Sequence, residues 1–290
     1  DIPQSVTVVN RALLDAQGVT SFADALRNVP GITIGGAEGG QIGNNIVLRG
    51  FSANNTDLYL DGFRDSGQYY RDLFDLEQVE VLVGPASMLF GRGSTGGVIN
   101  QVTKQATLAG FTEVSGTIGT DGRLRSTLDT DSKLSDTSAL RVNAFVQDLK
   151  TTRDVMSNKD FGVAPTLRFG IGQATEITLQ ALLQHNNDMP DYGVQSLNGS
   201  PITDTRDTDY GLASDSTVQD VSMFNATIKH HFNDNFELRS QAQLNHYITD
   251  ARESAAHALG TCTAGVAACT SNYSNITALS GPPSFSSTTD

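Results

Sequence analysis

Two patterns of apolar and polar residues divide the chain near Lys104. Before this point, short β-branched runs alternate with glycine-rich connections, and after it the polarity alternates residue by residue over longer stretches. A period of two places successive side chains on opposite faces of a strand. The pattern therefore predicts a small domain at residues 1–105 and a larger β-structure at residues 106–290.

The first hundred residues predict a mixture of short strands and helices. Helices are expected at 11–17 and 21–27, the second with Ser21 as its N-cap. Strands are expected in the β-branched runs at 1–9, 32–34, 46–51, 58–62, 79–83 and 98–102. The segment 63–72, FRDSGQYYRD, is polar and rich in Arg and Tyr, which is typical of a loop that meets a ligand. A solvated connector is the alternative interpretation of this segment.

After Lys104 the alternation predicts about seven strands of roughly ten residues each. They are expected at 112–118, 124–130, 140–149, 161–171, 177–184, 224–232 and 236–248. Their connections are short in several places, but long and polar at 185–218 and after residue 250. Short turns at one end and long loops at the other are typical of an outer-membrane barrel. A soluble β-sandwich is the less favoured alternative.

Strands of this number cannot close a barrel in lipid, because every backbone group there needs an internal hydrogen-bond partner. The sequence also stops within a stretch rich in Ser, Thr and Pro, near Pro282 and Pro283. We therefore expect the N-terminal part of a longer barrel protein, either truncated or incomplete.

Composition agrees with this expectation and argues against other classes of protein. No apolar run approaches the roughly 18 residues of a membrane-spanning helix. The net charge of −13 argues against nucleic acid as a partner, since a phosphate backbone demands a basic face. Cys262 and Cys269 lie in a polar segment, which favours a surface disulfide in an oxidising compartment over free thiols or a metal pair.

Signatures of catalysis or metal binding are weak. The run at 91–96 matches G-x-G-x-x-G, but a strand-like run at 98–102 follows where a dinucleotide site needs a helix. No Walker loop and no G-x-S-x-G elbow occurs. The five histidines are scattered without the spacing of a zinc site. The sequence thus predicts neither an enzyme nor a metal or cofactor bound directly by the protein.

Several ordered motifs in the first hundred residues resemble those of a known family. They are DIPQSVTVV at 1–9, LRNVPGI at 26–32, LRGF at 48–51, YLDG at 59–62, VEVL at 79–82, GPAS at 84–87 and FGRGSTGGVIN at 90–100. Together they resemble the plug domain of TonB-dependent outer-membrane siderophore receptors, most densely the catecholate-type group. Two departures stand out. Val83 replaces the Lys that the family usually has before Gly-Pro, and the energy-coupling box that the family carries ahead of the plug is not in the chain.

The resemblance implies a mainly β fold, in which a small α+β plug domain lies inside an antiparallel transmembrane β-barrel. It also implies a receptor in the bacterial outer membrane that binds a ferric siderophore and imports it by plug movement, driven by the TonB–ExbB–ExbD complex. Iron is then carried as ferric siderophore, whose own oxygen donors satisfy the metal. The alternative is a TonB-linked sensor, or another outer-membrane binding barrel that does not transport siderophore.

On this interpretation the Arg/Tyr-rich loop supplies the ligand site. Arg64 and Arg71 are expected to donate charge-assisted hydrogen bonds to an anionic complex. Tyr69 and Tyr70 are expected to pack on catechol rings. Gln68, directly before these tyrosines, is expected to donate a further hydrogen bond.

A second set of charged residues is expected to join the plug to the barrel. A plug held within a polar lumen needs its buried charges paired, because an unpaired buried charge is costly. Arg49, Glu77, Glu80 and Arg92 are the predicted members of this plug–barrel latch, which inward pulling would release. The alternative is that they only hold the plug itself together.

Overall fold

The computed structural model describes residues 5–35, 45–53, 56–84, 96–120, 122–151, 153, 156–194, 196–197, 200–201, 207–209, 211–254 and 285–289. Strands dominate this part of the chain, as the sequence predicts. Among the described residues, no helix has the length and hydropathy that crossing a membrane requires.

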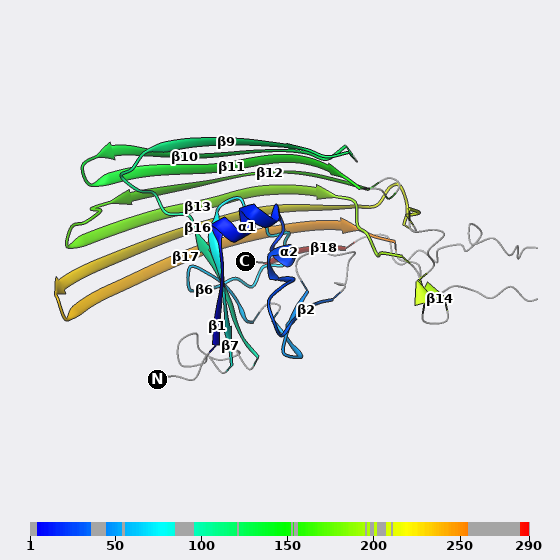
Figure 1. Ribbon diagram of the computed structural model, residues 1–290, viewed down its shortest axis with the longest axis horizontal. Helices are drawn as coiled ribbons and strands as arrows, with labels where there is room; N and C mark the ends of the chain where they lie inside the picture. The colour runs from blue at the N-terminus through cyan, green and yellow to red at the C-terminus, as the bar shows by residue number, and fades with distance from the viewer. Residues whose placement is uncertain are drawn as a thin grey trace, which may run out of the picture.

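The largest element is an antiparallel sheet of eight strands in the order β18-β17-β16-β13-β12-β11-β10-β9. Its strands are β9 (Phe111–Ile118), β10 (Leu124–Ser135), β11 (Ser138–Lys150), β12 (Ser157–Phe169), β13 (Thr175–Asp188), β16 (Ser216–Asn233), β17 (Phe236–Arg252) and β18 (Phe285–Thr289). It forms a curved wall over the smaller N-terminal elements (Figure 1). A two-stranded sheet, β14 (Ser196–Leu197) with β15 (Ser200–Pro201), lies in the connection between β13 and β16.

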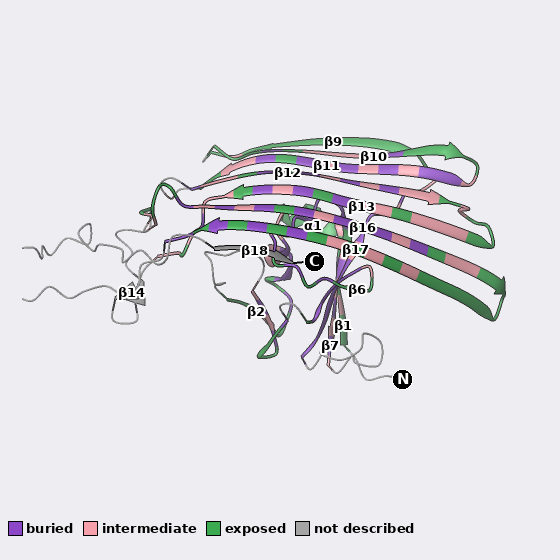
Figure 2. Cartoon of the chain, turned by 180° about the vertical axis from the view of Figure 1, so that it is seen from behind, coloured by how far each residue is buried: buried purple, intermediate pink, exposed green. Residues whose placement is uncertain are grey.

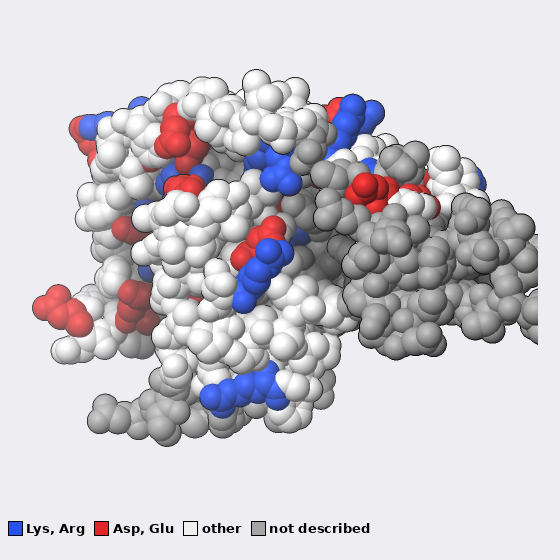
Figure 3. All heavy atoms as spheres, turned by 45° about the vertical axis from the view of Figure 1, so that its right-hand side comes forward, with Lys and Arg blue, Asp and Glu red and all other residues white. Residues whose placement is uncertain are grey.

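The two faces of this large sheet differ in character, as the alternation predicts. On β16 and β17, exposed apolar side chains such as Phe224 and Leu244 alternate with buried residues such as Val221 and Met223 (Figure 2). The exposed set on the large sheet also includes Val146, Phe161, Leu179 and Ile228, and in Figure 3 charged side chains lie in separate small groups. One face of the sheet is therefore apolar and unpartnered, and the other packs on the N-terminal elements.

The connections of the large sheet are uneven. The links β10–β11, β12–β13 and β16–β17 are tight turns, which together define the short-turn end, whereas 27 residues separate β13 from β16 at the opposite, long-loop end (Figure 1). Gly170 opens one of the tight turns with φ +69°, and a Cβ there would lie 2.0 Å from the Thr175 carbonyl oxygen. The ring centroids of Phe232 and Phe236 lie 5.1 Å apart beside another tight turn. Exposed aromatic residues near the strand ends are typical of a transmembrane barrel.

The N-terminal elements form a second, five-stranded sheet in the order β1-β7-β8-β5-β6. Its strands are β1 (Ser5–Asn10), β7 (Leu76–Val83), β8 (Gly97–Thr103), β5 (Leu58–Leu60) and β6 (Phe63–Arg64). All its pairs are antiparallel except β5 with β8. A three-stranded sheet completes this part, with β2 (Ile32–Ile34), β3 (Ile46–Leu48) and β4 (Phe51–Ser52).

Two helices pack on the five-stranded sheet. Helix α1 (Arg11–Gln17) begins after Asn10, whose side chain accepts a hydrogen bond from the Leu13 amide, and it ends at Gly18. Helix α2 (Phe22–Leu26) begins after Ser21, which caps the Asp24 amide. Capping oxygens satisfy amides that have no partner within the helix. The helices contribute their apolar side chains to a core with the sheet, including Leu14, Phe22, Leu26, Val79, Val81 and Ile99.

The predicted helices and strand positions are confirmed, with corrections at the boundaries. The strands of the large sheet are longer than expected, and β16 runs for 18 residues. The loop predicted at 185–218 is correspondingly shorter, because β13 continues to Asp188 and β16 begins at Ser216. On β13 the continuing residues 185–188 are all polar, so hydropathy alternation did not reveal that they extend the ladder.

Candidate functional site

The Arg/Tyr-rich loop crosses the inner face of the large sheet, and its backbone is fixed there by glutamines. Gln219 of β16 accepts a hydrogen bond from the Tyr70 amide at 2.9 Å and donates to the Gln68 carbonyl at 3.2 Å. Gln184 of β13 donates to the Tyr70 carbonyl at 2.7 Å. Both glutamines lie in the parts of their strands nearer the long-loop end. The loop is thus held near the end from which the long connections extend.

A single carboxylate organises the interior of this loop. Asp65 is fully buried and accepts hydrogen bonds from the Tyr69 hydroxyl at 2.9 Å, Arg71 Nε at 2.9 Å and the Tyr247 hydroxyl of β17 at 3.1 Å. Gln101 donates to the same carboxylate at 3.4 Å. A buried charge is tolerated when it is paired and hydrogen-bonded in this way. Asp65 therefore ties the loop both to β8 and to the large sheet.

The rings around Asp65 are packed closely. Tyr69 stacks on Tyr247 with ring centroids 5.5 Å apart, and the Arg71 guanidinium lies 4.3 Å from the Tyr69 ring. Burial raises the pKa of Tyr69 well above its usual value, and the nearby Asp65 charge raises that pKa further. A Cβ on Gly67 would lie 2.6 Å from the Tyr247 ring. The loop can reach the sheet this closely only with glycine at that position.

Next to this cluster, an ion pair joins the loop to the large sheet. Asp72 binds Arg125 of β10 through both carboxylate oxygens, at 2.6 and 2.7 Å. Arg125 also donates to Gln147 and lies 4.8 Å from the Phe145 ring. Burial raises the pKa of Asp72, while Arg125 acts in the opposite direction. Removing one partner of such a pair leaves a buried charge uncompensated.

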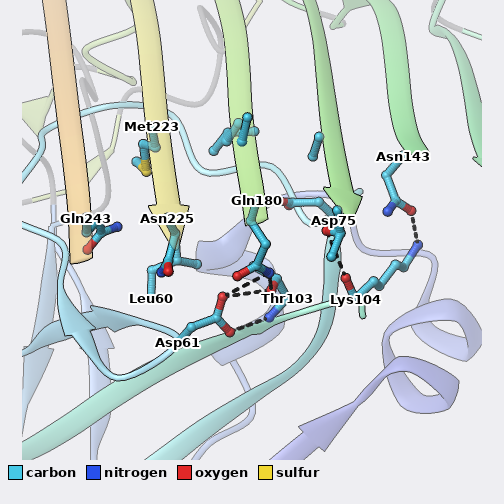
Figure 4. A pocket seen from close by; sticks show the side chains of 14 residues that line it. Leu60, Asp61, Asp75, Thr103, Lys104, Asn143, Gln180, Met223, Asn225 and Gln243 are labelled. Carbon is cyan, nitrogen blue, oxygen red and sulfur yellow. Dashed lines mark hydrogen bonds between the residues drawn. The ribbon is translucent and has the colours of Figure 1, made fainter. Parts of the chain in front are cut away.

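Further polar contacts lie nearer the short-turn end. Lys104 forms an ion pair with Asp129 of β10 at 2.9 Å and donates to the Phe74 carbonyl at 2.8 Å. Asp75 and Lys104 line a pocket between the five-stranded sheet and the large sheet (Figure 4). Burial raises the pKa of Asp75 to about 7, and the neighbouring Asp72 adds to this shift. The contact between the two sheets is therefore rich in buried charge.

The structure divides the five predicted ligand residues into two groups. Arg64 and Gln68 are exposed, and Tyr70 is half-buried, so these three side chains retain accessible surface. Tyr69 and Arg71 are only 3% and 2% exposed, and Asp65 occupies their polar groups. In this geometry Tyr69 and Arg71 hold the loop, and their contact with a ligand stays a prediction.

The predicted latch residues that the structure describes lie in different surroundings. Glu80 accepts hydrogen bonds from Gln78 and Asn100 of its own sheet, whereas Glu77 is exposed beside a cavity of about 520 Å³, where its charge attracts Arg141 of β11. Arg49 is exposed at a turn with φ +51°. Ion pairs between the sheets do occur, but they are Asp72–Arg125 and Lys104–Asp129. The latch role of Arg49, Glu77, Glu80 and Arg92 stays a prediction.

Some predicted residues fall outside the described part of the chain. They are Arg92 of the latch and the proposed disulfide partners Cys262 and Cys269. Within the residues that are described, no group of three His, Cys, Asp or Glu side chains is arranged to hold a metal ion.

Comparison with known proteins identifies the family. Residues 1–98 match the TonB-dependent Receptor Plug Domain. The chain is 36% identical to the probable TonB-dependent receptor BfrD of Bordetella pertussis, over 79% of this chain and 32% of that protein. It is 35% identical to the catecholate siderophore receptor Fiu of Escherichia coli K12, over 83% of this chain and 34% of that protein. The chain thus spans about a third of the length of these relatives.

Solved structures agree with these matches. The siderophore receptor PiuA of Acinetobacter baumannii superimposes with a TM-score of 0.83 and 34% identity, over 88% of this chain and 38% of that one. The open form of the E. coli ferric-catecholate import receptor Fiu gives a TM-score of 0.79 and 30% identity, over 88% and 40% of the two chains. The chain belongs to the TonB-dependent receptors, which are outer-membrane proteins, and it is similar to siderophore receptors of the catecholate group.

Proposed function

We propose that the whole protein is an outer-membrane receptor that binds a ferric siderophore of the catecholate type and imports it. The similarity to Fiu, a ferric-catecholate import receptor, and to the siderophore receptor PiuA supports the substrate class. We assign residues 1–105 to the plug and residues 106–290 to the first part of the barrel, whose eight-stranded sheet is the barrel wall. The short-turn end of the wall then faces the periplasm and the long-loop end faces outward.

The observation that carries this proposal is the placement of the loop at 65–72. Its backbone is fixed to the wall near the outward end, while Gln68 and Tyr70 keep accessible surface. A catecholate complex offers aromatic rings and anionic oxygen atoms, which tyrosine, glutamine and arginine side chains recognise. Arg64, Gln68 and Tyr70 are therefore the proposed ligand contacts, held in place by Asp65.

Import requires the plug to move, and we propose that the TonB–ExbB–ExbD complex drives this movement. The contacts that movement must break include two buried ion pairs, Asp72–Arg125 and Lys104–Asp129, beside apolar packing such as that of Phe74 on Phe145. We propose that these two pairs serve as the plug–barrel latch. When the plug shifts, the separated charges of an ion pair can form hydrogen bonds with water. Separating an apolar contact of similar size would instead expose apolar surface to water.

The test compares cells with and without the gene, supplied with a ferric tris-catecholate as sole iron source. Growth and uptake of ⁵⁵Fe should depend on the gene, and no dependence for any ferric catecholate would overturn the transport function. In the purified whole receptor, Arg64→Ala/Tyr70→Ala should weaken equilibrium binding of ⁵⁵Fe-catecholate by about tenfold. Arg27→Ala is the matched control, since Arg27 is an exposed plug residue whose ion-pair partner among the described residues is Asp24.

A further inference from the structure

The carboxyl group of Asp75 is buried where the plug meets the barrel wall. Asp75 directly precedes β7 and is only 6% exposed. It lines a small cavity of about 30 Å³ together with Asn143 of β11 and Thr166 of β12 (Figure 4). Within the part of the chain that the structure describes, Asp75 forms no ion pair. A buried carboxylate without a counter-charge is costly, so the neutral, protonated form is favoured there.

The cation beside Asp75 is bound to other groups. Lys104 lines the same cavity, and its ammonium group forms an ion pair with Asp129 at 2.9 Å. The same group donates to the Phe74 carbonyl oxygen at 2.8 Å and to Asn143 Oδ1 at 3.3 Å. An ammonium group has three hydrogens to donate, and these three acceptors use all of them. The charge of Lys104 therefore acts on Asp75 only from a distance.

Two other carboxylates add negative charge near Asp75. Asp72 and Asp61 belong to the same plug, and the charge of each opposes ionisation of Asp75. Asp72 itself binds Arg125 through both carboxylate oxygens, so this second cation is also occupied. Burial first, and the two charges with it, raise the pKa of Asp75 to about 7. Below that pH the seated plug carries a proton on Asp75.

The barrel wall forms one side of the surroundings of Asp75. Ala164, Gln180 and Leu182 of the wall also line the cavity (Figure 4). This side is lost when the plug is displaced, because the wall residues stay with the barrel. Water then reaches the carboxyl group, whose pKa returns toward its ordinary value of 3.8. Displacement of the plug therefore releases a proton at pH values between about 4 and 7.

We propose that Asp75 acts as a proton switch between the plug and the barrel wall: the bound proton keeps the plug seated, and its loss favours release. This inference rests on the plug movement of the proposed function, but the switch itself requires neither siderophore nor TonB. Because the seated plug binds the proton more tightly than the displaced plug, displacement becomes easier as pH rises from about 4 to about 7. Above this range both states are ionised and the dependence ends. The plug thus closes the barrel more firmly in acid than in neutral surroundings.

The test measures plug displacement in the whole receptor, inserted into a planar lipid bilayer without siderophore. A fixed, sub-denaturing concentration of urea on the periplasmic side displaces the plug in a small fraction of the molecules, and each displacement opens a step of ionic conductance. The open fraction of the wild-type receptor should rise at least about tenfold from pH 5 to pH 7, and only about twofold from pH 7 to pH 9. Asp75→Asn keeps the shape but cannot release the proton, so its open fraction should rise less than about threefold over the whole range. Asp15→Asn, at an exposed plug carboxylate paired with Arg11, is the matched control and should behave as the wild type.

Three results would overturn the proton switch. An open fraction of the wild type that does not change with pH would exclude it while leaving the proposed function intact. The same holds if Asp75→Asn keeps the full pH dependence. Absence of conductance steps at every pH would remove plug displacement, and with it both the switch and the proposed route of import. Should Asp75→Asn fold poorly, the wild-type curve alone decides, because its rise must level off near pH 7 and a continued steep rise to pH 9 would exclude Asp75.

Discussion

At the scale of single residues, Asp65 does more for the candidate site than any side chain that faces the ligand. Its carboxylate gathers donors from the loop, from β8 and from the barrel wall. In the proposed site, the ligand contacts Arg64, Gln68 and Tyr70 therefore lie on a loop held by a side chain that the ligand would not touch. Charged hydrogen bonds of this kind are stronger than neutral ones, so their loss has consequences beyond the residue itself.

We predict that Asp65→Asn loosens the loop and weakens binding. Asparagine keeps the shape but leaves the buried Arg71 without a carboxylate, at a cost of about 3–5 kcal/mol. Hydrogen exchange of the amides at 65–72 should quicken, and affinity for ferric catecholate should fall, while the barrel still folds. Exchange measured by mass spectrometry checks this, with Asp136→Asn as an exposed control. Unchanged exchange in the loop would contradict the positioning role.

The sequence predicted this loop but not the direction of its side chains. Arginine, tyrosine and aspartate close together mark a functional loop, and the segment FRDSGQYYRD was identified on that basis. Whether Tyr69 faces a ligand or the interior depends on Tyr247, which lies 182 residues beyond Asp65 in the chain. Contacts at such separation leave no local signal. Asp65 and Asp72 were missed for the same reason.

At the scale of elements, the barrel strands were the most predictable part and the plug contacts the least. Alternation places Arg125, Asp129 and Arg141 on the same face of their strands as other inward residues. Charges on an inward face need partners, so this pattern signals contact with something polar in the lumen. The pattern does not specify which plug residue forms the ion pair. Arg141 and Lys104 in fact share Asp129.

The Asp72–Arg125 pair should show strong coupling between plug and wall. Asp72→Asn and Arg125→Gln should each destabilise the plug by about 3–5 kcal/mol, whereas the double variant should cost clearly less than their sum. Denaturant unfolding of the plug within the folded barrel gives the three values. Additive losses would mean that the pair contributes no interaction, and that another contact holds the loop to β10.

Asp75 should make plug stability depend on pH. Its pKa is 3.8 ordinarily and about 7 when buried, so the folded plug retains a proton that the unfolded chain has lost. The unfolded state is therefore favoured progressively as pH rises from about 4 to 7, and no further above 7. Asp75→Asn removes this dependence. The stability difference between variant and wild type should grow from pH 5 to pH 7 and then level off, and a constant difference would contradict the assignment.

At the scale of the whole molecule, one face of the barrel wall is assigned to lipid and the other to the plug. Residues adjacent in sequence therefore face either lipid or the polar lumen. Leu244 is 71% exposed on the apolar face, while its neighbour Asn245 lies on the inward face. Leu244→Lys should hinder folding into the outer membrane, because a lysine facing lipid costs up to about 2–4 kcal/mol near the bilayer midplane. Asn245→Lys places the same charge in the polar lumen and should be tolerated. The heat-modifiable electrophoretic mobility of the receptor in the outer-membrane fraction measures how much of each variant is folded. Equal folding of the two variants would contradict the assignment of faces, on which both the latch and the ligand loop depend.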